Sequence, residues 1–256
     1  MSYLADLIVC DCPFSFSDTL SMSTVARGAA ANYQVMTHQD LVNLPVAQVT
    51  APDAILAFWV PSSLLQEGLE IMNAWGFRQT QTWIWVKTKQ DPGTVLKKQL
   101  RTKINKGQIN KSDAQQIVDQ FDYHQTLNFG MGHLFRQCHE LVMLGVKGKP
   151  YRMLKNKSQR SISFAPATKH SVKPGDLQDR LELMFPDAQH KLELFGRRSR
   201  PGWSVLGNES PMTFGEDVTL SLGKLNKLTV TQAESLEKNL KTIDANKLKD
   251  FWSCEL

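Results

Sequence analysis

The sequence predicts an α/β fold, in which a β-sheet is layered by helices. Short apolar runs alternate along the chain with segments of helical periodicity, and this alternation is typical of such sheets. The chain has 256 residues, of which 41% are hydrophobic and 21% charged, an ordinary composition for a globular protein with a substantial core. The apolar runs are too short to cross a bilayer, so we expect no membrane-spanning segment.

Each predicted strand is a short segment rich in apolar residues, of the length that strands usually have. The first strand ends directly before Asp11, and the sixth ends directly before Gly196. Turns at the carboxyl ends of strands are where α/β sheets bind their ligands, so both turns are candidate sites. In chain order the predicted strands are Ala5–Cys10, Ala54–Val60, Thr82–Val86, Glu140–Val146, Ser161–Ala165, Lys191–Phe195 and Ser204–Leu206.

Helix starts can be predicted at two places. Thr37 and Asp40 have the spacing of a capping box and predict a short helix. Ser62 and Ser63 predict the cap of a second helix. The side chains expected on one face of the second helix are Leu65, Leu69 and Met72, and those expected on one face of a third, later helix are Leu177, Leu181 and Met184.

Residues 88–128 differ from the rest of the chain, because they are polar, rich in lysine and weakly patterned. We expect an insertion, part helix and part loop, where target recognition takes place. A solvated helix face and contact with phosphates both explain its basic residues. A net charge of +5 and a pI of about 9.0 suit a polyanionic partner. The residues expected to contact nucleic acid are Lys97, Lys98, Arg101 and Lys103.

The segment after Pro211 is expected to form a C-terminal helical appendage. Thr231 and Glu234 have capping-box spacing at the start of a stretch with an apolar face. The predicted organisation is a main domain over residues 1–210, which contains the insertion over 88–128, and the appendage over 211–256.

Asp11-Cys12-Pro13-Phe14 carries the most chemical information in the chain. A carboxylate and a backbone carbonyl that each accept one N–H of an exocyclic amine would localise the lone pair of its nitrogen toward an incoming methyl group. A proline after the carbonyl-bearing residue stiffens the turn, and an aromatic ring offers a stacking surface for a base. Taken alone, the tetrad also fits an ordinary turn after a strand.

Three later segments make the pattern specific: His170–Pro174, Leu192–Arg198 and Pro201–Glu209. In this order and spacing, the chain over roughly residues 5–210 resembles the MTA-type adenine-N6 methyltransferases. That family is typified by the messenger-RNA adenine-N6 methyltransferase and its bacterial and viral relatives. Its usual tetrad, Asp-Pro-Pro-Trp, is altered here to Asp-Cys-Pro-Phe.

The resemblance implies a Rossmann-like sheet with permuted motif order, in which the tetrad precedes the main cofactor motifs. It also implies S-adenosylmethionine as the methyl donor, with Lys173 at its carboxylate, and no metal. The catalytic residues that correspond to the family are Asp11, Cys12, Pro13 and Phe14. The cofactor residues that correspond to it are Asp11, Lys173, Phe195, Arg197, Asn208 and Glu209.

Two further residues are implied near the base. Tyr33 follows a loop of small residues that matches an active-site loop of the family, although a surface tyrosine explains it too. Glu140 matches a family glutamate close to the base, although its spacing from Arg136 also suits an ordinary ion pair. In the tetrad, Cys12 stands in place of the first proline and still supplies a backbone carbonyl. Pro13 restricts the backbone of Cys12 toward an extended conformation.

The implied reaction is methyl transfer to the N6 amine of adenine in nucleic acid. DNA is preferred over RNA, because the compact chain resembles the short bacterial and viral members. Two alternatives stay open: a non-catalytic nucleic-acid-binding partner subunit of an active methyltransferase, and an amino-methyltransferase acting on cytosine N4 or a modified base. The expected partners are nucleic acid and a possible homo- or hetero-oligomer. The expected location is a bacterial or virus-infected cytoplasm, or the nucleus of a eukaryote.

Overall fold

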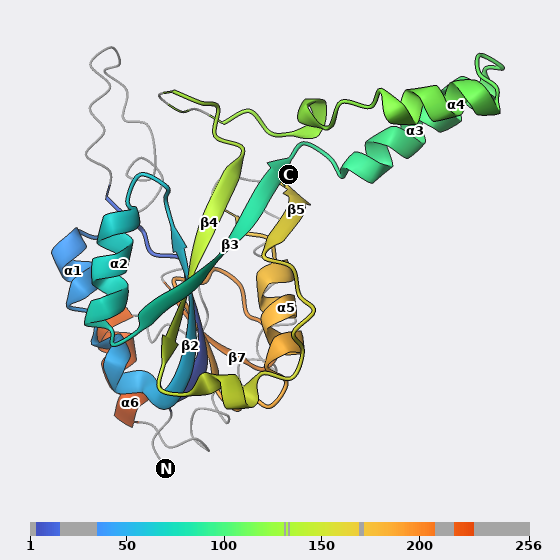
Figure 1. Cartoon of the computed structure of the whole chain (residues 1–256). Helices are drawn as coiled ribbons and strands as arrows, with labels where there is room; N and C mark the ends of the chain where they lie inside the picture. Colours follow the sequence, from blue (N-terminus) through green and yellow to red (C-terminus); the bar gives the residue numbers. More distant parts are fainter. Residues whose placement is uncertain are drawn as a thin grey trace, which may run out of the picture. The chain divides into compact units, whose positions relative to one another are not determined.

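The structure is a computed structural model that describes residues 4–15, 35–130, 132, 134–168, 172–207 and 218–227 (Figure 1). The chain forms two compact units. The first comprises Met1–Thr82, Val142–Lys157 and Glu182–Leu256. The second comprises Trp83–Leu141 and Ser158–Leu181.

The described strands belong to one seven-stranded sheet with the order β5-β3-β4-β2-β1-β6-β7. β1 lies parallel to β2 and β6, β6 to β7, and β3 to β5. The predicted α/β fold with a Rossmann-like sheet is confirmed, and each predicted strand is present. The strands are β1 (Ala5–Cys10), β2 (Thr50–Val60), β3 (Arg78–Thr88), β4 (His139–Lys147), β5 (Ile162–Pro166), β6 (Lys191–Leu194) and β7 (Trp203–Leu206).

The centre of the first unit is made by β1 and β2. Leu7, Ile8 and Val9 of β1 are all buried, and so is the run from Ala54 to Val60 in β2. Strands that are apolar on both faces are typical of parallel sheets covered by helices on both sides. β1 is therefore held rigidly up to Cys10, the residue before the tetrad.

The short helix α1 (His38–Val42) begins as the sequence predicts. The Thr37 hydroxyl accepts the backbone N–H of Asp40 at 3.2 Å, and the Asp40 carboxylate accepts the backbone N–H of Thr37 at 3.2 Å. This reciprocal capping box satisfies two backbone donors that would otherwise lack partners at the helix start. The next helix, α2 (Leu65–Ala74), contacts α1 (Figure 1).

Two predictions about α2 are wrong. The helix begins after Leu64, which makes no capping side-chain hydrogen bond, so Ser62 and Ser63 do not cap it. Its apolar face is also rotated: Leu65 and Leu69 are exposed, whereas Gly68, Ile71 and Met72 are buried. The reason is close packing, because a Cβ on Gly68 would lie 2.7 Å from Val60 Cγ1. The glycine side of the helix thus approaches β2 more closely than a leucine side could.

The second unit contains the basic segment, which is mostly helical. α3 (Pro92–Asn105) is capped by the Asp91 carboxylate, which accepts the backbone N–H of Thr94 at 2.7 Å. α4 (Lys111–Asp119) begins with a capping box between Asn110 and Asp113. The two helices contact each other (Figure 1), and none of their described side chains is buried. The unit also contains the 3-10 helix η3 (Tyr123–Thr126).

Helix α5 (Asp176–Met184) buries Leu177 and Leu181, as the sequence predicts, and Met184 is half-buried. The remaining short elements are the 3-10 helices η2 (Pro45–Val49) and η4 (Pro150–Met153).

Within the expected helical appendage over 211–256, the structure shows a helix for which the sequence analysis gave no range. α6 (Val218–Lys227) contacts η2 and β7 and buries its apolar side. Val218, Leu222 and Leu225 recur at helical spacing, so the signal was present in the sequence. The helix predicted after Thr231 lies outside the described residues. No helix in the described ranges has the length and hydropathy needed to span a membrane.

Candidate functional site

The carboxyl ends of three neighbouring parallel strands lie side by side in the first unit. Cys10 of β1 pairs with Leu194 of β6, which pairs with Leu206 of β7. Beyond these pairs, the Asp11 N–H donates to the Leu194 carbonyl at 3.3 Å, and the Gly196 N–H donates to the Leu206 carbonyl at 3.2 Å. The sheet therefore brings the turn after β1 beside two turns from much later in the sequence, at the edge where α/β sheets bind ligands.

The tetrad at the end of β1 is held by its backbone. The Pro13 carbonyl accepts the N–H of Met36 at 2.8 Å, and the Ser15 N–H donates to the Met36 carbonyl at 3.2 Å. The Cys12 carbonyl accepts the N–H of Phe14 at 3.0 Å. A carbonyl oxygen has two lone pairs, so this bond leaves Cys12 one acceptor position for a substrate amine.

Phe14 is a core side chain in this arrangement. Only 6% of its surface is exposed, and its ring stacks on Phe58 with 5.8 Å between centroids and 30° between planes. Phe58 contacts Trp75 in turn. The ring of Phe14 thus anchors the tetrad to β2, and its expected contact with a base stays a prediction.

Cys12 supplies a carbonyl while its thiol is turned inward. Its Sγ lies 3.2 Å from the Sγ of Cys10, and both residues are buried. Burial, together with the neighbouring thiol of Cys10 and the charge of Asp11, raises the pKa of Cys12 well above its ordinary value. The thiolate is the nucleophilic form of cysteine, so a neutral thiol here argues against covalent catalysis by Cys12.

The turns after β6 and β7 touch each other. Phe195 has φ of 62° and is the one non-glycine residue with positive φ among those the structure describes. A Cβ on Gly207 would lie 2.3 Å from the Gly196 carbonyl oxygen, so the approach of the two backbones requires glycine. Strained backbone of this kind clusters at ligand sites. Arg197 follows with an exposed side chain.

A carboxylate on α5 fixes the second half of this turn. Nε and Nη2 of Arg200 each lie 3.1 Å from an oxygen of Glu182, and the Trp203 indole N–H donates to the same carboxylate. Burial alone would raise the pKa of Glu182, but the hydrogen bonds from Arg200 and Trp203 outweigh it and hold the pKa below its usual value. Arg200 is therefore held in a bidentate ion pair within the structure.

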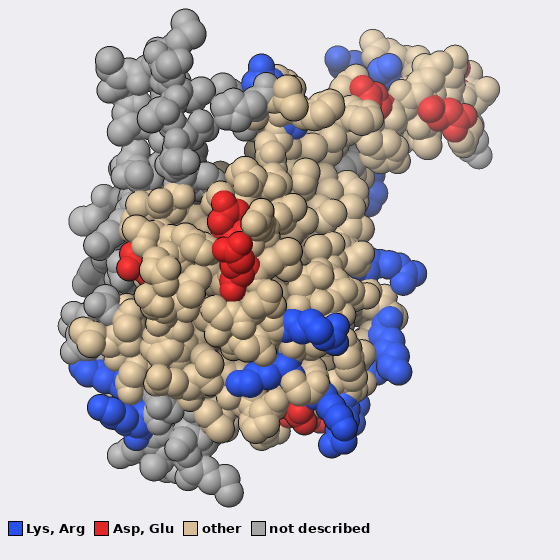
Figure 2. Space-filling model, turned by 60° about the vertical axis from the view of Figure 1, so that its left-hand side comes forward, with Lys and Arg blue, Asp and Glu red and all other residues tan. Residues whose placement is uncertain are grey.

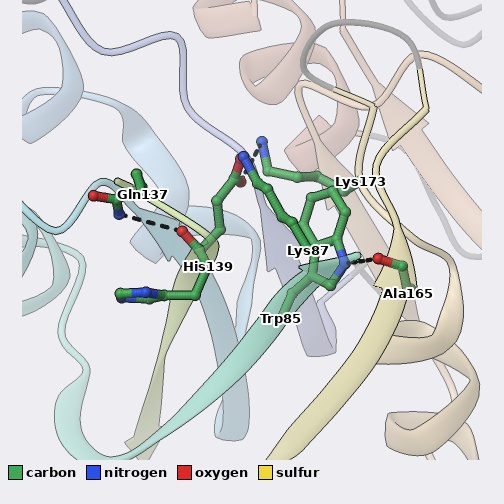
Figure 3. Close-up of polar contacts among 7 residues, drawn as sticks. Trp85, Lys87, Gln137, His139, Ala165 and Lys173 are labelled. Atoms are coloured by element: carbon green, nitrogen blue, oxygen red, sulfur yellow. Dashed lines mark hydrogen bonds and ion pairs between the residues drawn. The ribbon is translucent and has the colours of Figure 1, made fainter. Parts of the chain in front are cut away.

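In the second unit, two lysines share one carboxylate (Figure 3). Lys87 Nζ lies 2.5 Å from Glu140 Oε1, and Lys173 Nζ lies 3.2 Å from Glu140 Oε2. Burial alone would raise the pKa of Glu140, but the charges of Lys173 and Lys87 hold it below its usual value. The structure thus brings together Lys173 and Glu140, two residues that the sequence analysis singled out separately. Arg136, the alternative partner of Glu140, lies over the ring of Phe129.

Lys87 is the member of this cluster that the sequence analysis missed. Its ammonium lies 5.2 Å from the centroid of the Trp85 ring, a cation–π contact. The Trp85 indole N–H donates to the Ala165 carbonyl of β5 at 2.9 Å, and this bond fixes the ring (Figure 3). The signal was the spacing of Trp85 and Lys87, because alternate residues of a strand share one face.

The comparisons with known proteins agree with these motifs. The MT-A70 family model matches residues 5–112 and 117–209, which include the tetrad and the turns after β6 and β7. The chain belongs to the MT-A70 family.

Proteins similar to this chain include one named as a catalytic subunit and one named as a non-catalytic subunit. The chain is 28% identical over 181 residues to the human N(6)-adenosine-methyltransferase catalytic subunit METTL3, covering 69% of this chain and 25% of METTL3. It is 25% identical over 184 residues to the type II methyltransferase M.MunI of Mycoplasma sp, covering 72% and 62%. It is 25% identical over 193 residues to the non-catalytic subunit METTL14 of Xenopus tropicalis, covering 70% and 35%. The chain thus spans about a quarter of METTL3.

The basic residues of α3 point to more than one side of that helix. All four are exposed. At about 100° per residue, Lys97, Lys98 and Arg101 fall within one arc, whereas Lys103 lies on the opposite side. One phosphate backbone can therefore contact three of them. Figure 2 shows acidic as well as basic side chains on the described surface in view, not one unbroken basic patch.

Three site residues expected of an MT-A70 member cannot be placed, since Tyr33, Asn208 and Glu209 lie outside the described residues. Within the described ranges, no three His, Cys, Asp or Glu side chains gather in a way that could hold a metal ion.

Proposed function

We propose that this protein is an S-adenosylmethionine-dependent methyltransferase that acts on the N6 amine of adenine in nucleic acid, with DNA preferred over RNA. The observation that carries the proposal is the convergence of Asp11, the Phe195–Arg197 turn and Gly207 at one edge of a parallel sheet. In a chain of the MT-A70 family, that edge joins the tetrad to the motifs assigned to the cofactor.

The available charges suit the methyl donor. MT-A70 methyltransferases generally use S-adenosylmethionine, which carries a carboxylate, an ammonium and a sulfonium. Asp11 offers a carboxylate to a cation, and Arg197 offers an exposed guanidinium to ribose or adenine oxygens and nitrogens. Lys173 offers an ammonium to the carboxylate. Each charged group of the amino-acid end thus has a counterpart of opposite sign in the chain.

Asp11 and Cys12 would act on the substrate amine. The Asp11 carboxylate accepts one N–H and the open lone pair of the Cys12 carbonyl accepts the other, so the nitrogen lone pair is localised and directed out of the ring. S-adenosylmethionine supplies an electrophilic methyl group when bound. Because β1, the Met36 bonds and the Phe14–Phe58 stack hold the tetrad, both acceptors stay in place without reorganisation.

DNA is the preferred substrate for two reasons. The exposed basic side of α3 suits the dense phosphate charge of a duplex. The similarity also covers 62% of the length of M.MunI but only 25% of the length of METTL3. The chain therefore matches most of the type II methyltransferase and only a small part of METTL3.

The second candidate is a non-catalytic partner subunit, since METTL14 is also a relative. METTL3 is named as a catalytic subunit and METTL14 as a non-catalytic subunit, which favours an assembly in which this chain pairs with a second chain. The retained Asp11 and Lys173 favour an active chain, because a subunit that does no chemistry needs neither.

The deciding experiment is nucleoside mass spectrometry. Purified protein is incubated with methyl-labelled S-adenosylmethionine and either duplex DNA or RNA, each containing all four bases, beside an Asp11→Ala control. We expect labelled N6-methyladenine in DNA with the wild type and none with the variant. Label in N4-methylcytosine would transfer the assignment to that base, and label in RNA alone would overturn the preference for DNA. No label in either polymer would favour the non-catalytic subunit.

A further inference from the structure

Lys87 makes two contacts that direct its ammonium group to Glu140. Its side chain is 22% exposed, it lies against the Trp85 ring, and its ammonium meets Glu140 Oε1 at 2.5 Å. Trp85 is itself fixed by its bond to Ala165 (Figure 3). Holding a lysine side chain in one position costs entropy, which the ion pair with Glu140 and the contact with Trp85 offset.

The carboxylate of Glu140 lies between Lys87 and Lys173, and the charges of these three groups indicate what Lys87 does. Lys173 is 17% exposed and meets the other oxygen of Glu140 at 3.2 Å. Counted by themselves, the ammonium groups of Lys87 and Lys173 and the carboxylate of Glu140 sum to a charge of +1, and one incoming carboxylate on Lys173 brings these groups to zero. Without Lys87, the same event would place two carboxylates on one ammonium, with a charge of −1 in a half-buried site. Such a site either repels the ligand or takes up a proton.

We propose that Lys87 is a positioning residue for the cofactor lysine: it neutralises Glu140, so that Lys173 can bind the carboxylate of S-adenosylmethionine without repulsion. The inference rests on the proposed function, because it assigns Lys173 to that carboxylate. Lys87 itself does not touch the cofactor in this account. Its effect passes through Glu140.

The first test needs no cofactor. Carboxyl carbon NMR of ligand-free protein reports the pKa of Glu140, with the resonance identified by its loss in Glu140→Gln. Among the described residues, the charged groups that face Glu140 are Lys87 of β3 and Lys173 of the segment before α5. We expect Lys87→Met to raise the pKa of Glu140 and Lys87→Arg to restore it, because arginine keeps the charge and the aromatic contact. Lys89→Met is the matched control, since Lys89 is exposed and directly follows the same strand.

The second test measures S-adenosylmethionine binding by calorimetry in two buffers of different ionisation enthalpy. We expect Lys87→Met to weaken binding roughly tenfold, the scale of one ion pair in a partly solvated site, and to couple binding to proton uptake. Lys87→Arg should bind like the wild type without proton uptake, as should Lys89→Met. A variant that had merely lost packing would bind weakly with no proton linked to it.

Three outcomes would overturn the inference. An unchanged pKa of Glu140 in Lys87→Met would mean that the ion pair does not form. A raised pKa with wild-type cofactor affinity would remove the positioning role. If the wild type itself bound no S-adenosylmethionine, the proposed function would be wrong, and the cofactor role of Lys87 would be wrong as well. In that case the NMR titration would still show whether Lys87 and Glu140 are paired, so the two failures are distinguishable.

Discussion

Replacing Lys97, Lys98 and Arg101 of α3 by alanine should weaken nucleic-acid binding at every sequence alike. The three side chains are exposed and lie on one side of the helix, whereas Lys103 lies on the other. Alanine favours helix, and exposed substitutions usually change stability by no more than about 0.5 kcal/mol, so α3 should stay folded. The variant therefore removes charge and little else.

The size of the effect follows from the number of phosphate contacts. On duplex DNA each lost contact flattens the dependence of log affinity on log salt by about 0.9, so three lost contacts should flatten it by about 2.7. Lys103→Ala is the matched control, because it removes the same kind of charge from the opposite side of the helix. Its salt dependence should stay that of the wild type.

The assay is a titration of fluorescent duplex DNA at several salt concentrations, with wild type, the triple variant and Lys103→Ala side by side. S-adenosylmethionine affinity of the triple variant should not change, since no residue of α3 is assigned to the cofactor. Parallel salt dependences for all three proteins would refute the phosphate assignment and leave α3 as a solvated helix. An equal change in Lys103→Ala would refute the one-sided contact.

The remaining predictions concern the site residues. Asp11→Ala should abolish methylation while cofactor affinity, measured by calorimetry, stays within about tenfold; near wild-type turnover would exclude the amine-binding role. Lys173→Ala should weaken S-adenosylmethionine binding by roughly 1.5–3 kcal/mol, and an unchanged affinity would remove this lysine from the cofactor site. The pKa of Glu182 is lower in the folded protein than in the unfolded chain, so its ionised carboxylate stabilises the folded protein at pH values above the ordinary carboxyl pKa of about 4.3. This stabilisation is lost as the pH falls through the pKa of the folded state. Chemical denaturation at pH 7 and pH 3.5 should therefore show a smaller acid loss of stability in Glu182→Gln than in wild type, and equal losses would contradict the assignment.

Several features of the fold could be predicted because they depend on neighbouring residues alone. The strand at Ala5–Cys10 was predicted with its observed ends, since the continuous apolar run from Leu7 to Cys10 has few alternatives to a buried strand. The capping box of Thr37 and Asp40 was also predicted, because its partners are three residues apart. The face of α2 was predicted wrongly, because the packing of Gly68 on Val60 joins two separate elements.

For the candidate site, the sequence by itself singled out the turns that the structure brings together: the tetrad after β1 and the glycine-containing turns after β6 and β7. Motif spacing encodes those turns locally, and the parallel sheet then places them side by side. Only the tertiary structure decided how the charges are paired. Glu140 meets Lys87 and Lys173 from different elements, Glu182 holds Arg200 and Trp203, and Phe14 turns into the core. The physical reason is that charge pairing and burial depend on distances in space, which strand register and helix packing set between residues far apart in the chain.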